Sequence, residues 1–138
     1  MRRKELQVIE IPKWGNYLRG KWREYFASHL SEEKQKTIGM DGFLWHLCSW
    51  EEVDYLANVD AKKVFQKQRK QKCLIFYQLI DEAFLINNGE TLSIDDLPYD
   101  QLHMDYGDIY VMDWDGQWTF MMTHERQCGP YFIRKTKT

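Results

Sequence analysis

The sequence lacks the features of a secreted or membrane-bound protein. Its 138 residues include three cysteines, Cys48, Cys73 and Cys128, and no CxxC pair. An odd number of cysteines at these spacings indicates reduced thiols rather than a disulfide framework. No apolar run reaches the length of a signal-peptide core or a membrane span. We therefore expect a cytoplasmic protein that makes no contact with a membrane.

Motifs of known enzyme classes are missing as well. The sequence has no glycine-rich phosphate loop, no GxSxG nucleophile elbow and no HExxH zinc motif, so we expect no cofactor. On a strand, His46 and Cys48 would share one face, and Cys73 or Cys128 would join them as a further ligand of a tetrahedral zinc site. Their spacing matches no zinc motif, and the apolar runs around Cys48 and Cys73 favour buried, inert thiols.

Basic residues are absent between Cys73 and Glu125, a segment that carries eleven carboxylates. All nineteen lysines and arginines lie outside it, several of them between Lys62 and Lys72. Because the aromatic residues of the acidic segment have no basic neighbours in the sequence, phosphate would be repelled where bases would stack. The net charge of −2 also argues against a strongly basic surface, so we expect no nucleic-acid partner.

The chain has the length of one domain and enough apolar residues for one core, with aromatic residues at 15%. Patterns typical of helices fill its first half and patterns typical of strands its second half. The sequence therefore predicts a single α+β domain over residues 1–138. We expect a mainly antiparallel sheet of about five strands with the N-terminal helices packed on one face.

The first half contains three predicted helices. Apolar residues at helical spacing predict a helix over 14–30, after a short strand over 6–11 that ends at Pro12. Ser31 fits the N-cap of a short helix that ends before Gly39. We expect a strand over 43–48 and a helix over 60–68 capped by Asp60.

The second half centres on a predicted β-hairpin. Asp115 and Gly116 suit a two-residue type I′ turn between strands over 108–114 and 117–123. Equal offsets from this turn pair Val111 with Phe120 and Ile109 with Met122. Residues 73–80 read as a central strand covered on both faces, with 83–86 beside it, and a last strand covers 131–133 after Pro130.

Three sequence runs resemble those of a known family. They are Ile11-Pro12-Lys13-Trp14-Gly15, the run from Phe43 to Ser49, and Trp118 to Glu125 followed by Gly129-Pro130-Tyr131-Phe132. These runs resemble domain-of-unknown-function family 4275, small proteins of Bacillus-type bacteria. The resemblance implies an autonomous bacterial cytosolic domain and transfers no catalytic residue. The last run also resembles the ends of other small bacterial domains, some of which look like immunity proteins.

Two function classes follow from the acidic segment. In the first, a non-enzymatic protein of immunity or inhibitor type presents an acidic surface to a basic protein partner, because complementary charge speeds encounter and sets specificity. The binding residues would lie in the connection before the hairpin and at its rim. They are Asp100, Asp105, Tyr106 and Asp108.

The second class is a small metal-dependent enzyme. His124 and Glu125 leave the predicted hairpin together, and a His beside a carboxylate suits general acid and base catalysis. His103 and Asp105 precede the partner strand and would meet His124 there, which gives two histidines and one carboxylate for a divalent metal. Alternatively, His124 and Glu125 hydrogen-bond the loop backbone and fix the turn at Gly129 and Pro130.

Overall fold

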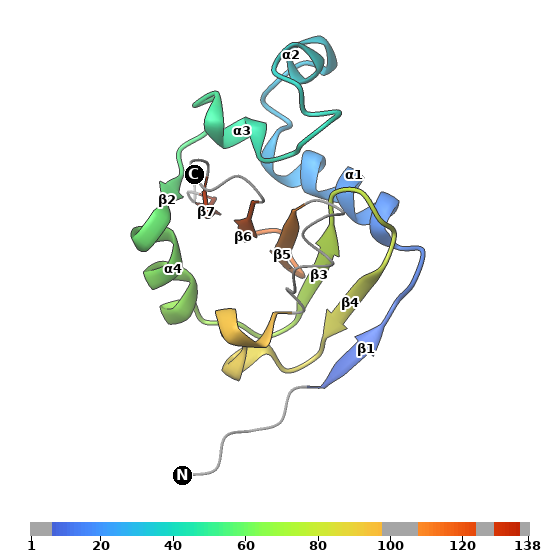
Figure 1. Cartoon of the computed structure of the whole chain (residues 1–138), viewed down its shortest axis with the longest axis vertical. Helices are drawn as coiled ribbons and strands as arrows, with labels where there is room; N and C mark the ends of the chain where they lie inside the picture. The colour runs from blue at the N-terminus through green and yellow to red at the C-terminus, as the bar shows by residue number, and fades with distance from the viewer. Residues whose placement is uncertain (1–6, 98–107, 124–128, 136–138) are drawn as a thin grey trace.

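A single antiparallel sheet forms the framework of the protein. The structure, a computed structural model, describes residues 7–97, 108–123 and 129–135 (Figure 1). Within these residues seven strands pair in the order β1-β4-β3-β5-β6-β7-β2. The strands are β1 (Val8–Glu10), β2 (Leu56–Ala57), β3 (Cys73–Tyr77), β4 (Ala83–Ile86), β5 (Ile109–Asp113), β6 (Trp118–Met122) and β7 (Tyr131–Arg134). The α+β class and the antiparallel pairing are as predicted, whereas the sheet has more than the expected five strands.

Helices cover both faces of this sheet. The described helices are α1 (Gly15–Phe26), α2 (Glu32–Thr37), α3 (His46–Ser49) and α4 (Asn58–Lys67), with short 3-10 turns η1 (Gly89–Thr91) and η2 (Ile94–Asp96). Figure 1 shows α1 and α3 on one side of the curved row of strands and α4 on the other. Our prediction of helices on one face is therefore wrong for α4. None of the helices described here is long and apolar enough to cross a membrane.

The reason for two covered faces is the apolar character of the central strands. All five residues of β3 are buried, as predicted. Leu74 and Phe76 pack toward α1 and α3, and Ile75 and Tyr77 pack with Phe65 of α4. Successive side chains of a strand point to opposite faces, so a strand that is apolar throughout needs a layer on each side.

The predicted hairpin register is confirmed, but the turn differs. Ile109 pairs with Met122 and Val111 with Phe120. A type I′ turn needs positive φ at both central residues, and of Asp115 and Gly116 only Gly116 has it, at 71°. The Gly116 N–H instead donates to the Asp113 carbonyl at 2.9 Å, which moves the centre of the turn one residue toward the N-terminus.

The sequence predicted one helix cap correctly and the ends of two other helices wrongly. The Ser31 hydroxyl accepts from the Lys34 N–H at 3.1 Å, so the predicted N-cap of α2 is confirmed. The helix expected over 14–30 ends at Phe26. α4 begins at Asn58, which places Asp60 in the first turn instead of at the cap.

The strand predicted over 43–48 is wrong, because this segment turns into α3. The N–H of Ser49 donates to the Trp45 carbonyl at 3.2 Å, and that of Trp50 to the His46 carbonyl at 2.9 Å. A short apolar run does not distinguish a strand from a buried helical turn. The helical turn places Trp45 in the core with 1% of its surface exposed.

Candidate functional site

Most residues predicted to bind or catalyse lie outside the described part of the chain. Only Asp108, among the predicted binding residues, falls within it. The residues outside it are Asp100, His103, Asp105, Tyr106, His124 and Glu125. The metal cluster and the catalytic pair His124–Glu125 therefore stay predictions.

We expected Asp108 to belong to an exposed acidic surface, and this prediction is wrong. Its side chain is fully buried, and its Oδ2 accepts a hydrogen bond from the Trp45 indole N–H at 2.5 Å. The backbone carbonyl of Asp108 accepts from the Gln78 N–H at 3.0 Å, and the Gln78 side chain accepts from the Leu44 N–H and the Tyr110 hydroxyl. A buried carboxylate needs such hydrogen-bonding partners to offset its lost hydration. Asp108 therefore links α3 to the sheet.

The two cysteines that the structure describes lie in the core, where a thiol has little access to reagents. Cys48 and Cys73 are buried free thiols. Burial raises the pKa of Cys73 to about 12, and burial also raises the pKa of Cys48. His46 lies on α3 with its Nδ1 2.9 Å from the Ile38 carbonyl oxygen, so it does not share a strand face with Cys48. Among the described residues no three His, Cys, Asp or Glu side chains lie close enough to hold a metal ion.

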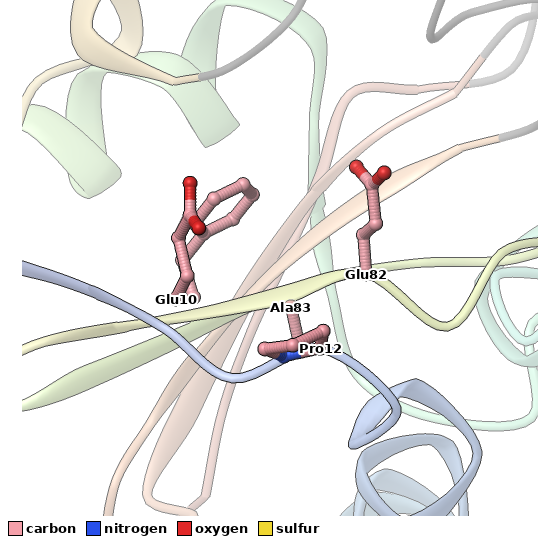
Figure 2. Close-up of a pocket in the computed structure, with 5 residues that line it drawn as sticks. Glu10, Pro12, Glu82 and Ala83 are labelled. Carbon is pink, nitrogen blue, oxygen red and sulfur yellow. The ribbon is translucent and has the colours of Figure 1, made fainter.

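An acidic pocket lies at the β1 end of the sheet. We use this name for the cavity of about 160 Å³ lined by Glu10, Pro12, Glu82, Ala83 and Phe84. Glu10 pairs with Phe84 across β1 and β4, and Glu82 lies two residues before Phe84, so the three side chains share one face of the sheet. Figure 2 shows both carboxylates on that same side, above Pro12 and Ala83. The pocket therefore has two acidic groups beside an apolar wall.

Among the strands that the structure describes, β1 beside this pocket stands at the end of the sheet order. β1 pairs with β4 on one side and is the last strand in the sheet order. Its Val8 and Ile9 are 53% and 46% exposed. An end strand of this kind presents backbone hydrogen-bonding groups and apolar side chains to a partner.

A second surface feature is an aromatic groove between α1 and the hairpin turn, with a volume of about 280 Å³. Trp14, Tyr17, Lys21 and Tyr25 line it from the α1 side. Leu74 and Met112, which pair across β3 and β5, also line the groove, as do Trp114 and Asp115. Its most exposed aromatic residues are Tyr17 at 55%, Trp14 at 44% and Trp114 at 42%.

Lysines from three separate segments lie beside the aromatic rings of this groove. The Lys72 ammonium is 4.7 Å from the centroid of the Trp114 ring, and that of Lys135 is 5.1 Å from the Tyr25 ring. The Lys21 ammonium lies 5.8 Å from Tyr25. These distances are in the range of cation–π contacts.

Neither surface could be recognised in the sequence, because each depends on contacts between distant segments. Glu10 and Glu82 come together only when β1 pairs with β4, a pairing that no local signal specifies. The sequence does indicate one side of the groove, since Tyr17, Lys21 and Tyr25 are spaced by four residues and share one helix face. The Lys72–Trp114 contact requires β3 to pair with β5.

Comparison with known proteins gave one match. The family model described as Domain of unknown function (DUF4275) matches residues 1–132. No curated protein matches the chain. No solved structure matches it.

Proposed function

Because this chain belongs to the DUF4275 family, whose description leaves its function open, we propose from its surface that it is a non-enzymatic protein-binding domain. Its partner is a basic protein, and its contact surface is acidic. The observation that supports this proposal most is the acidic pocket, where Glu10 and Glu82 stand beside the apolar residues Pro12 and Phe84. In this proposal Glu10 and Glu82 take the binding role that we had assigned to Asp108, which is buried.

The pocket suits a long basic side chain. Lysine and arginine have apolar stems and charged ends, so a stem can pack on Phe84 while its end meets the two carboxylates. Arginine suits a pair of carboxylates better than lysine does, since its planar group donates several hydrogen bonds in fixed directions. The exposed edge of β1 extends this contact by adding backbone hydrogen bonds to an extended partner segment.

An inhibitor or immunity protein with an acidic surface would cover a basic surface of its target through complementary charge. We extend the proposal to that class and to a bacterial cytoplasmic location. The free thiols of Cys48 and Cys73 support the location, since reduced cysteines are typical of the cytoplasm.

The proposal is tested by affinity capture with charge-reversed variants. Tagged protein would be incubated with cell extract, and bound proteins would be eluted with increasing salt. Glu10→Lys together with Glu82→Lys is expected to abolish capture of a basic protein that the unchanged chain retains at low salt, because two attractive charges become repulsive.

A matched control keeps the same change in net charge. Glu32→Lys with Glu33→Lys alters two exposed carboxylates in the first turn of α2, away from the acidic pocket. This variant is expected to retain the captured protein. Equal loss in both variants, or capture that salt does not weaken, would contradict the proposed contact surface.

A further inference from the structure

The aromatic groove combines stacking surfaces with positive charge, and we propose that it binds a single strand of nucleic acid. Two bases would stack on Trp114 and on the Trp14–Tyr17 pair, with phosphates near Lys21, Lys72 and Lys135. This site lies apart from the acidic pocket and does not depend on the protein-binding proposal.

Exposed aromatic rings supply the stacking surfaces. Trp14 and Tyr17 meet edge to face, with their centroids 5.4 Å apart and their planes at 82°, so they form a corner at the start of α1. Trp114 lines the groove from the hairpin turn. Aromatic side chains that stay 42% to 55% exposed leave surface on which a base can stack.

The positive charge comes from outside the acidic segment. Lys72 directly precedes β3, and its carbonyl accepts from the Trp114 N–H at 3.0 Å, so the two residues are fixed as cross-strand neighbours. Lys135 follows β7, and its N–H donates to the Gln117 carbonyl at 2.8 Å. We expected no nucleic-acid partner because no basic residue accompanies the hairpin aromatics in the sequence, and these contacts remove that objection for Trp114.

Two carboxylates moderate the charge of the groove. Asp115 lines it, and Glu24 pairs with Lys21 at 3.3 Å. The Lys21–Glu24 pair is solvent-exposed and therefore contributes little energy, so it would compete weakly with a phosphate for Lys21. The three ammonium groups favour an anionic ligand over an uncharged proline-rich peptide, which is the other occupant that suits an aromatic groove.

The test is a titration of the full chain with the oligonucleotide dT8, followed by tryptophan fluorescence. We expect saturable quenching, because Trp14 and Trp114 lie in the groove. Three phosphate contacts to a single strand predict a slope of about −2 in a plot of log K against log salt. Lys72→Gln is expected to reduce the magnitude of that slope by about 0.7.

Matched aromatic variants separate groove binding from general effects. Trp114→Leu is expected to weaken dT8 binding at least about fivefold, the effect of losing one stacked base. Trp50→Leu serves as the control, since Trp50 is 55% exposed and is not among the residues that line the groove. Asp115→Asn is expected to tighten binding, because it removes a charge that repels phosphate.

Four outcomes would overturn the proposal. The first is the absence of saturable quenching, and the second is equal weakening by Trp50→Leu and Trp114→Leu. The third is heparin binding as tight as dT8 binding, and the fourth is binding of decaproline in place of dT8. Heparin carries charge without bases, so equal affinity would remove the stacking role of Trp114. Decaproline binding would assign the groove to a peptide. Circular dichroism of each variant must match that of the unchanged chain for the comparison to count.

Discussion

The indole N–H of Trp45 donates to the carboxylate of Asp108 at 2.5 Å, and the two side chains expose 1% and 0% of their surfaces. This hydrogen bond joins the start of α3 to the start of β5. A hydrogen bond between two buried side chains contributes to stability, because its loss leaves buried polar atoms with fewer partners.

We expect Trp45→Phe to lower the free energy of unfolding by about 2–3 kcal/mol, since it removes the donor to Asp108 and leaves a void. Trp50→Phe changes the same residue type at an exposed position and is expected to cost about 0.5 kcal/mol or less. Urea unfolding curves with equal slopes would give both values. Equal costs for the two variants would contradict the structural role of the Trp45–Asp108 bond.

Two glycines offer a paired test of backbone geometry. Gly116 has a φ of 71°, and a Cβ atom there would overlap the ring of Tyr25. We expect Gly116→Ala to destabilise the protein by more than about 1 kcal/mol, because the backbone and the ring would both have to move. Gly20 lies within α1, and a Cβ atom added there would have no neighbour within 4 Å, so Gly20→Ala is expected to stabilise by about 0.5–1 kcal/mol. Thermal melting curves should shift in opposite directions, and a shared direction would contradict this explanation.

Burial predicts that the Cys48 and Cys73 thiols react slowly. The test uses a Cys128→Ser background, so that only these two cysteines are present. We expect neither thiol to react with a disulfide reagent at pH 8 in the folded protein, because the thiolate is the reactive form and burial raises both pKa values. In denaturant two equivalents should react at once. Rapid labelling of the folded protein would show that one thiol is accessible.

The raised pKa of Cys73 also predicts a pH dependence of stability. Between an unfolded pKa of roughly 8.5 and a folded pKa of about 12, the unfolded thiol loses its proton while the folded thiol keeps it. Deprotonation therefore favours the unfolded state, and stability falls as pH rises through this range. Lys70, whose pKa burial lowers, acts in the opposite direction.

A comparison with Cys73→Ala isolates the thiol, since Lys70 is present in both proteins. We expect the unchanged chain to lose stability more steeply than Cys73→Ala between pH 8.5 and 10 in urea unfolding experiments, by up to about 1.4 kcal/mol per pH unit. Parallel pH profiles would mean that the folded state does not protect the thiol.

Local chemistry made parts of the fold predictable. The register of β5 and β6 follows from alternating side chains around one turn, and a hydroxyl at Ser31 satisfies a free amide at the start of α2. The segment 43–48 could not be predicted in the same way. Its short apolar run fits a strand or a helical turn, and the choice depends on contacts of Trp45 with the distant residues Asp108 and Tyr131.

The surface positions of the acidic residues were harder to predict, because they depend on contacts between distant segments. Asp108 belongs to a strongly acidic segment, and only the position of Trp45 on α3 shows that its carboxylate is buried. Glu10 and Glu82 are separated along the chain, and the pairing of β1 with β4 brings them together. Charge counted along the sequence therefore could not show that the Asp108 carboxylate is buried or that Glu10 and Glu82 share one face of the sheet.

The proposed contact surface is tested most directly by nuclear magnetic resonance. Isotope-labelled protein would be titrated with an arginine-rich peptide at low salt, and backbone amide shifts would be followed along the chain. We expect the largest shifts at residues 8–12 and 82–84, around Glu10 and Glu82, and we expect them to disappear in the Glu10→Lys, Glu82→Lys variant. Shifts that concentrate on α2, or that persist in this variant, would contradict the proposed contact surface.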